Sequence, residues 1–309
     1  MTQPAQAAPA WQAIRLALVA RLGLAVIVAS PLLVLLALAF MAWTYAWAVL
    51  HMPCTGRFTS LERLGYPTEP VTFSTPEGYS LRGWYSPGQQ HPDTAIVVLG
   101  GLTTNTEYAL ADAWILAEAG YSTLVFEHRT CAYPGELSST GLHEAHDLIG
   151  AIDYLEGRPE IAHIGAMGFS VGGTAVMLAA AQDARIEAMV VTGGSAGLLE
   201  DTLDSSYPHG WLDWLLRRMI AVSLHLQARE SLEAMSPIRV VSTISPRPLL
   251  LVYGELEADT GREIAGAAGD NAELWIVPGA DHGQYEVLAP EEYHERIGRF
   301  FDAAFGTSR

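Results

Sequence analysis

The segment from Leu22 to Leu50 contains 29 residues without a charged side chain. A helix needs roughly 20 apolar residues to cross the hydrocarbon core of a bilayer, and a core helix is rarely so long and so uniformly apolar. Trp43, Tyr45 and Trp47 cluster near the end of the run, where aromatic rings suit the headgroup region. Pro31 interrupts it, but transmembrane helices tolerate proline, and neither piece alone would span. We therefore expect one transmembrane helix.

A cleaved signal peptide is the main alternative for this segment, because Ala46-Trp47-Ala48 has the small-x-small pattern that precedes a cut. The apolar run is about twice the usual signal core of roughly 7–15 residues. This length favours an uncleaved anchor over about residues 22–47, within an N-terminal segment of residues 1–50.

Charge is distributed unevenly along the chain. All 34 acidic residues follow Leu50, whereas the 17 basic residues are all Arg, and two of them, Arg15 and Arg21, precede it. The net charge of −17 is therefore +2 before residue 51 and −19 after it. Such an acidic chain is not expected to bind nucleic acid, because phosphate binding needs a basic face.

The charges on either side of the anchor bear on its orientation in the membrane. Arg57 and Arg63 follow the span and nearly balance Arg15 and Arg21 before it. The absence of acidic residues before the span favours a cytoplasmic N-terminus and an extracytoplasmic remainder.

The chain contains two cysteines, which excludes a disulfide scaffold and a Cys-rich metal site. Cys54 lies just after the span without the small-residue context of a lipoprotein cleavage site. We interpret it as an inert juxtamembrane thiol, with acylation as the alternative.

Strand-like and helix-like segments alternate after a connector over residues 51–70. Such alternation predicts an α/β domain over residues 71–309, with a mostly parallel sheet of about eight strands and helices on both faces. A turn at Pro76-Glu77-Gly78 predicts that the first two strands form a hairpin. The expected strands are Val71–Thr75, Leu81–Tyr85, Ala95–Leu99, Ser122–Phe126, Ile164–Gly168, Ile186–Thr192, Pro248–Tyr253 and Glu273–Val277. The expected helices are Asn105–Ala119, Leu142–Leu155, Gly172–Ala181 and Pro290–Ala304.

Residues 197–241 interrupt this alternation with an apolar, aromatic stretch of helical character around Trp211 and Trp214. An insertion between two strands can cover the carboxyl edge of the sheet, so we expect a short helical lid there. A partner-binding aromatic surface is the alternative.

Gly168-Phe169-Ser170-Val171-Gly172 has the pattern G-x-S-x-G between a predicted strand and a predicted helix. A nucleophilic serine projects from a tight strand-to-helix turn, and small residues are needed where the backbones crowd. The helix N-terminus also places backbone N–H groups near a developing oxyanion. We predict that Ser170 is a catalytic nucleophile.

A serine hydroxyl needs a base, and His282 lies in the loop directly after the last predicted strand. It follows Ser170 in the chain and lies at the carboxyl end of a sheet strand, where such a fold needs the base. His143 and His146 lie three residues apart on a predicted helix. A metal pair is possible in that pattern, but we favour a solvated helix face.

The base needs a carboxylate that orients it and stabilises its charged form. The loop after the strand at 248–253 carries three acids, Glu255, Glu257 and Asp259. Glu257 is three residues past Gly254, far enough to reach the strand end, and we expect it to be this acid. Asp259 is the alternative, and Glu255 is expected to face solvent. The sequence alone leaves this choice open.

A second oxyanion donor is expected from the loop after the Ala95–Leu99 strand, which begins Gly100-Gly101-Leu102. The glycines permit close approach of the backbone. We predict that the backbone N–H groups of Leu102 and Val171 form the pair. Neither a Walker motif nor G-x-G-x-x-G is present, so the loop is not predicted to bind the phosphates of a nucleotide.

From about Val71 onward the chain resembles the α/β-hydrolase superfamily, and together with its anchor it is similar to the serine-aminopeptidase-type hydrolases. Gly100-Gly101 replaces the usual His-Gly, and Glu257 replaces the usual Asp. Six motifs carry the resemblance and occur in the order expected for that superfamily. They are a strand ending in Gly100-Gly101, Glu127-His128-Arg129 with Gly135, Gly168–Gly173, Gly254-x-x-Glu257, Gly279-x-x-His282-Gly283 and the helix from Pro290.

These observations predict a membrane-anchored serine hydrolase that cleaves carboxylic ester or thioester bonds of a hydrophobic acyl substrate. Ser170, His282 and Glu257 would act through an acyl-enzyme, without a metal or organic cofactor. An acyltransferase or a peptidase on the same scaffold is an alternative. A catalytically silent, membrane-tethered binding protein is another.

Overall fold

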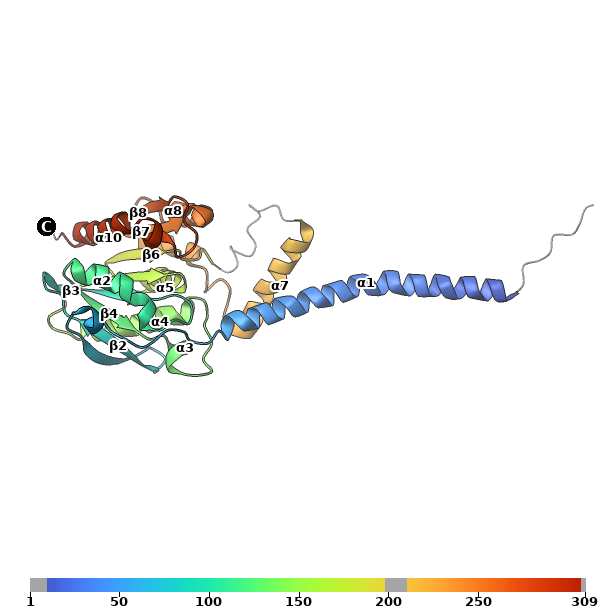
Figure 1. Cartoon of the computed structure of the whole chain (residues 1–309), viewed down its shortest axis with the longest axis horizontal. Coiled ribbons are helices and arrows are strands. Elements are labelled where there is room, and N and C mark those ends of the chain that lie inside the picture. The colour runs from blue at the N-terminus through green and yellow to red at the C-terminus, as the bar shows by residue number, and fades with distance from the viewer. Residues whose placement is uncertain (1–9, 198–209, 307–309) are drawn as a thin grey trace, which may run out of the picture.

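The computed structural model describes residues 10–197 and 210–306, and an eight-stranded sheet organises them (Figure 1). The strand order is β1-β2-β4-β3-β5-β6-β7-β8. β1 and β2 form the predicted hairpin, β2 is antiparallel to β4, and the remaining neighbours are parallel. The predicted α/β fold is therefore confirmed. The strands are β1 Glu69–Ser74, β2 Ser80–Ser86, β3 His91–Leu99, β4 Tyr121–Phe126, β5 His163–Phe169, β6 Ala188–Thr192, β7 Leu249–Gly254 and β8 Ala272–Val277.

Helices cover both faces of this sheet. α4, α5 and α8 pack on one face, and α2 and α10 pack on the other. Apart from α1 and α7, which are described below, the remaining helical segments are short turns in the connections between these elements. The α-helices of the domain are α2 Leu110–Glu118, α3 Arg129–Ala132, α4 Leu142–Glu156, α5 Val171–Gln182, α8 Ala258–Ala268, α9 Tyr285–Leu288 and α10 Pro290–Phe305. The 3-10 helices are η1 Leu61–Leu64, η2 Thr106–Ala109, η3 Pro237–Arg239, η4 Val241–Ile244 and η5 Glu255–Glu257.

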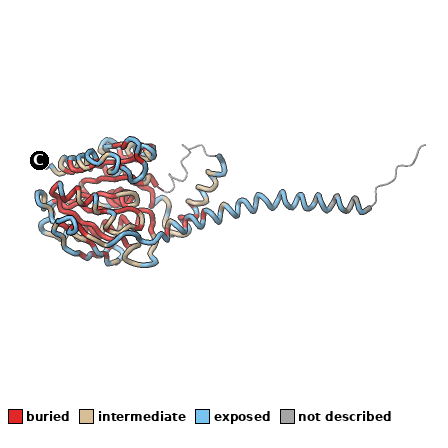
Figure 2. The backbone as a smooth tube through the Cα atoms, viewed as in Figure 1, coloured by how far each residue is buried: buried red, intermediate tan, exposed pale blue. Residues whose placement is uncertain are grey.

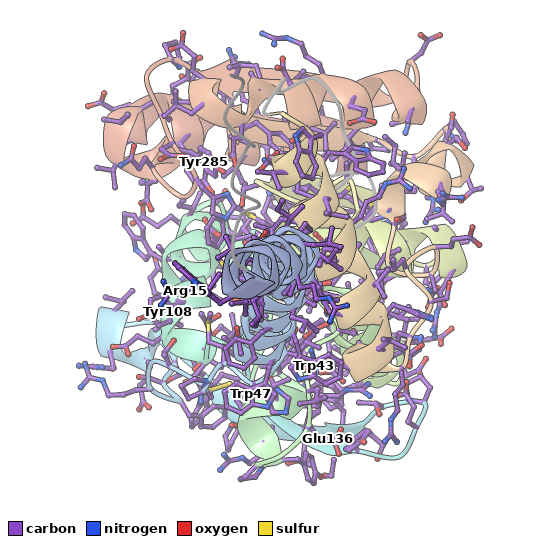
Figure 3. All side chains as sticks on the ribbon, turned by 90° about the vertical axis from the view of Figure 1, so that its right-hand side faces the viewer. Arg15, Trp43, Trp47, Tyr108, Glu136 and Tyr285 are labelled. Carbon is purple, nitrogen blue, oxygen red and sulfur yellow. A yellow bond between two sulfur atoms is a disulfide. The ribbon has the colours of Figure 1, made fainter. Side chains whose placement is uncertain are left out.

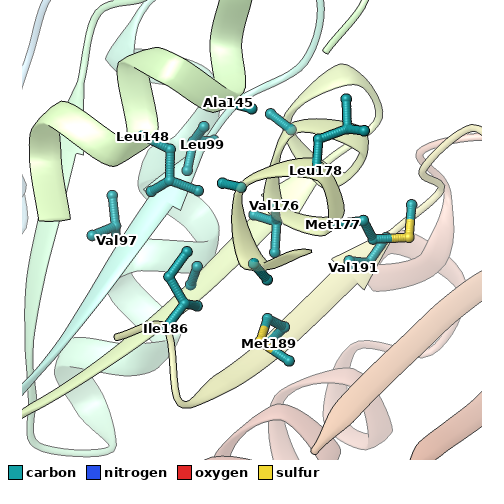
Figure 4. Close-up of a cluster of buried hydrophobic side chains, with 14 of the residues drawn as sticks. Val97, Leu99, Ala145, Leu148, Val176, Met177, Leu178, Ile186, Met189 and Val191 are labelled. Carbon is teal, nitrogen blue, oxygen red and sulfur yellow. The ribbon is translucent and has the colours of Figure 1, made fainter. Parts of the chain in front are cut away.

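The alternation of side chains along the buried strands divides the core into two layers. In β3, Val97 and Leu99 join the layer under α4 and α5 (Figure 4), whereas Ile96 and Val98 join the layer under α2. Each such fully buried side chain contributes about 1.5–3 kcal/mol. The buried tube in Figure 2 marks this core, which holds the carboxyl ends of the strands in fixed positions.

The N-terminal segment is one continuous helix, α1 (Ala10–Leu50), with Pro31 inside it. Figure 1 shows it leaving the domain as a long arm, and Figure 2 shows that most of this arm is exposed. Arg21–Leu50 is long and apolar enough to cross a membrane, by length and composition, with a mean hydropathy of 2.7. A signal sequence near an N-terminus has the same properties.

The insertion contains helix α7 (Trp211–Ala228), and residues 198–209 of the expected lid lie outside the described residues. α7 packs against α1 instead of over the sheet edge, with Leu224 in one buried cluster with Ala46 and Leu50. The Gln227 side-chain amide also donates a hydrogen bond to the carbonyl oxygen of Trp43, at 3.1 Å. The apolar side of α7 is thus matched by the apolar surface of α1.

Cys54 forms a disulfide with Cys131 on α3, so the interpretation of Cys54 as a free or acylated thiol is wrong. The two residues are 77 positions apart in the chain. They meet because the connector after α1 runs along the loop that follows β3. In that contact, Thr55 N donates to Thr103 O, and Asn105 N donates to Thr55 O, each at 2.9 Å.

Candidate active site

Ser170 lies on the sharp turn between β5 and α5, with φ 55° and ψ −117°. This is a strained conformation for a residue with a side chain, and the crowded backbone around it fixes the turn. A Cβ at Gly168 would lie 2.3 Å from the carbonyl oxygen of Gly172, and a Cβ at Gly172 would lie 2.5 Å from that of Gly100. Only glycine fits at both places, so the G-x-S-x-G pattern follows from packing.

His282 lies in the loop after β8, and its Nε2 is 3.0 Å from Ser170 Oγ. Its ring packs against Phe169, with 5.1 Å between the ring centroids. The side chain of His282 remains 44% exposed. Ser170 and His282 are therefore in hydrogen-bond contact, and the described residues leave His282 accessible to solvent.

Glu257 is the acid that the structure brings to His282. It lies at the end of η5 after β7, and its Oε2 is 2.8 Å from His282 Nδ1. Asp259, the alternative from sequence, is 71% exposed on α8 and pairs with Arg262. Glu255, expected to face solvent, is exposed and accepts a hydrogen bond from the Gly279 N–H.

Hydrogen bonding sets the charge states of this pair. The bond with Glu257 raises the pKa of His282 above its ordinary value, although burial opposes this shift. Burial alone would raise the pKa of Glu257, but hydrogen bonds with His282, Tyr285 and the Gly254 N–H outweigh it and lower that pKa. Glu257 is thus a carboxylate at neutral pH and stabilises the protonated form of His282.

Tyr285 is a site residue that the sequence analysis missed. It lies at the start of α9, and its hydroxyl donates a hydrogen bond to Glu257 Oε1. The hydroxyl oxygen of Tyr285 also lies 3.4 Å from His282 Nδ1. Burial, followed by the neighbouring Glu257 carboxylate, raises the pKa of Tyr285, so the phenol stays protonated and remains a donor. Its spacing of three residues from His282 was a signal, but tyrosines at such spacing are common.

The expected oxyanion donors lie on two adjoining turns. Leu102 is in the loop after β3, and Val171 is the first residue of α5. Within the described residues, neither backbone N–H has a hydrogen-bond acceptor. A Cβ at Gly101 would lie 3.5 Å from Ser170 Cβ, so this loop passes directly beside the serine.

The two histidines on α4 contact different acidic residues. His143 Nε2 lies 3.2 Å from Glu230 Oε1, whereas His146 contacts Glu77. Among the residues that the structure describes, no group of three or more His, Cys, Asp or Glu is arranged to hold a metal ion.

The arrangement can move one proton while a bond forms at Ser170. As Ser170 Oγ attacks an acyl carbonyl, its proton can pass to His282 Nε2, and the Glu257 carboxylate can stabilise the resulting imidazolium. Two N–H groups beside the serine are available to a developing oxyanion. This is the chemistry of acyl transfer.

Comparison with known proteins identifies the family. Residues 137–308, a range that includes Ser170, Glu257 and His282, match the prolyl oligopeptidase family. A polyketide transferase of Stachybotrys chlorohalonatus is 29% identical over 140 residues, which cover 43% of this chain. The match covers 46% of the fungal protein, so it spans about half the length of that relative.

Two solved structures show the same fold. The Pyrococcus furiosus esterase Pf2001 has a TM-score of 0.65 at 21% identity, covering 81% of this chain and 98% of its own. A puromycin-hydrolyzing peptidase of Mycobacterium tuberculosis has a TM-score of 0.62 at 17% identity, covering 79% of this chain and 40% of its own. The family match covers more than half of the chain, so the chain belongs to the prolyl oligopeptidase family, and the solved structures show its α/β-hydrolase fold.

Proposed function

We propose that the chain is a membrane-anchored serine hydrolase that cleaves carboxylic ester or thioester bonds. Ser170 is the nucleophile, and His282 accepts its proton and passes it to the leaving alcohol or thiol. Glu257 orients His282, and the Leu102 and Val171 amides bind the oxyanion. A water molecule, deprotonated by His282, then releases the acid from the acyl-enzyme.

The observation that carries this proposal is the continuous hydrogen-bonded series through three side chains from three loops. The distances are 3.0 Å from Ser170 Oγ to His282 Nε2 and 2.8 Å from His282 Nδ1 to Glu257 Oε2. Hydrogen-bond contact between nucleophile, base and orienting acid is the geometric signature of an activated serine. An ester substrate is supported by the esterase fold likeness and by the apolar surface that α1 and α7 place beside the domain.

A peptidase is the second candidate, because the matched family and one of the solved structures carry that activity in their names. Purified full-length protein is assayed with p-nitrophenyl esters of increasing chain length and with prolyl-peptide p-nitroanilides. We expect a fluorophosphonate probe to label Ser170 and the esters to give the higher kcat/KM. Efficient anilide cleavage without ester turnover would favour the peptidase, and absence of labelling would contradict both candidates.

The pH dependence of turnover tests the role of Glu257. Only neutral His282 can accept the serine proton, and its pKa is raised, so kcat/KM is expected to fall as pH drops through a midpoint above about 6.5. Glu257→Gln removes the carboxylate that causes the rise, and we expect the midpoint to move to lower pH while the maximal rate falls. Profiles of kcat/KM between about pH 5 and 9 measure this, and a midpoint that stays or rises would argue against Glu257.

We further propose that α1 anchors the protein and that the catalytic domain is extracytoplasmic. The Cys54–Cys131 disulfide supports this orientation, because disulfides persist in oxidising compartments and are rare in the cytosol. The Arg residues before the span agree with a cytoplasmic N-terminus. Protease added to right-side-out vesicles is expected to digest the domain, whereas protection there and digestion in inverted vesicles would reverse the assignment.

A further inference from the structure

Helix α7 presents a continuous apolar and aromatic face that the described residues leave uncovered. Its exposed large side chains follow helical spacing, so they share one side of the helix. Trp211 is 71% exposed and Trp214 is 49% exposed, which is unusual for residues of this size in a water-soluble surface. The exposed apolar residues of α7 are Trp211, Leu212, Trp214, Val222 and Leu226.

The charges on α7 differ from those of the rest of the chain. The guanidinium of Arg218 lies 4.3 Å from the ring centroid of Trp214 on the exposed side. Asp213, the acidic residue of this helix, pairs with Arg217 at 2.7 Å. The exposed face is therefore apolar, aromatic and cationic, although the chain carries a net charge of −17. Trp and Leu with Arg are the composition of helices that lie at a membrane surface.

The exposed face of α7 lies beside the candidate membrane-spanning helix α1. Figures 1 and 3 show the two helices side by side, and the Gln227–Trp43 hydrogen bond joins α7 to the aromatic end of α1. The uncharged run of α1 is roughly 44 Å long at about 1.5 Å per residue, whereas a hydrocarbon core is about 30 Å thick. The run is thus longer than the core, and where α1 crosses a bilayer we expect the end with Trp43 and Trp47 at the headgroup level, because aromatic rings are enriched there. Helix α7 lies next to this end.

Two hollows between the helices continue the apolar surface. One, of about 290 Å³, is lined by Ala39, Trp43 and Arg218 among others, so the guanidinium group of Arg218 lies near the aromatic end of α1. The other, of about 480 Å³, lies deeper along α1. Its lining is nearly all apolar and consists of Ser30, Pro31, Val34, Leu35, Leu38, Trp211 and Leu212.

We propose that α7 is a lipid-contacting helix that lies in the headgroup and upper acyl region of the bilayer that α1 crosses. Trp211 and Leu212 contact acyl chains, Trp214 and Arg218 contact headgroups, and lipid chains fill the hollow beside Leu35. This inference rests on the proposed anchoring by α1. An acidic domain gains little from an anionic bilayer surface, so the exposed Arg218 of α7 supplies a local electrostatic attraction to anionic headgroups.

The test uses the full-length protein in phosphatidylcholine–phosphatidylglycerol liposomes with acyl-brominated phosphatidylcholine, which quenches tryptophan fluorescence at short range. Five tryptophans lie on the two helices, and Trp211 and Trp214 are two of them. We expect the double variant Trp211→Phe/Trp214→Phe to lose about two-fifths of the lipid-quenched intensity. Trp84→Phe and Trp275→Phe, within the domain, are matched controls and should leave that intensity unchanged.

Each other outcome contradicts the lipid contact. If the intensity lost in the double variant is quenched by aqueous iodide, the face lies in water. If neither iodide nor brominated lipid quenches it, the face is covered by protein, and its dependence on the protein-to-lipid ratio would identify a second copy. Residual lipid quenching from Trp11, Trp43 and Trp47 reports on the anchor itself. Turnover of a short, water-soluble ester reports separately on the proposed hydrolase.

Discussion

Ser170→Ala is expected to lower kcat for ester hydrolysis by about 10⁴-fold or more, because removal of an activated nucleophile leaves only the catalysis by oxyanion binding and substrate positioning. The alanine fits the same turn, since the crowding there involves the flanking glycines and the serine backbone. Binding of substrate is expected to be retained. Steady-state kinetics with a p-nitrophenyl ester, together with fluorophosphonate labelling, measure the loss.

Two comparisons make this result specific. Ser74→Ala removes an exposed serine from the edge strand β1 and should leave kcat unchanged. Adding His282→Ala to the Ser170→Ala variant should cause little further loss, because the base has no function without the nucleophile. Turnover of Ser170→Ala within tenfold of the parent would reject Ser170 as the nucleophile.

The central strands of the sheet were predictable because they are buried on both faces. Every residue of β4 and β7 is buried, and such continuous apolar segments are distinct in the sequence. The predicted carboxyl ends of β3, β4, β6 and β8 coincide with the observed ones, and the other boundaries differ by one to four residues. The largest difference is at His91, where β3 begins in a polar turn-like stretch. Helix α8 was missed because its first residues, Ala258 and Asp259, were interpreted only as the loop that carries the triad acid.

The site was predictable to the extent that its residues lie at strand ends. Strands β5, β7 and β8 run parallel, as the alternation of elements predicts, so their carboxyl ends bring Ser170, Glu257 and His282 to one edge of the sheet. The choice between Glu257 and Asp259 depends on where η5 ends and α8 begins, which sequence spacing does not determine. Tyr285 depends on a side-chain contact between two loops.

Long-range contacts of the connector and the insertion were not predictable. The Cys54–Cys131 disulfide joins positions with no local pattern in common. The packing of α7 on α1 pairs two apolar surfaces, and the sequence does not distinguish an apolar surface that meets a sheet edge from one that meets another helix. Both the disulfide and the packing of α7 on α1 depend on how distant segments are arranged in the folded chain.

The turn after β4 contacts the loop after β3, which carries the proposed oxyanion donor Leu102. His128 is buried, its Nε2 lies 3.4 Å from the carbonyl oxygen of Gly100, and burial lowers its pKa so that the ring is neutral. The next residue, Arg129, is held by Asp147 on α4, with Nε 2.7 Å from Oδ1 and the backbone N–H 2.9 Å from Oδ2. The ion pair thus fixes the backbone that places His128.

Arg129→Met is expected to lower the free energy of unfolding by about 3–5 kcal/mol, because it leaves the Asp147 carboxylate buried without its cation. Both side chains are almost completely buried, at 3% and 0% exposure, so water cannot replace the lost partner. Guanidinium unfolding of the full-length protein in detergent, followed by circular dichroism, measures the change. Arg299→Met is a matched control, since its partner Glu295 is exposed and the expected effect is at most about 1 kcal/mol.

The double variant Arg129→Met/Asp147→Leu distinguishes the unpaired charge from a general loss of packing. If the destabilisation comes from the uncompensated carboxylate, the double variant recovers a large part of the stability lost in Arg129→Met, because an apolar pair of similar volume needs no desolvation of charge. If the two substitutions simply add, the ion pair acts through shape alone, and the assignment to charge is wrong. Asp147→Leu also removes the acceptor of the Arg129 backbone N–H, so kcat is expected to stay reduced in the double variant even where stability recovers, if placement of the His128 backbone is what the pair supplies.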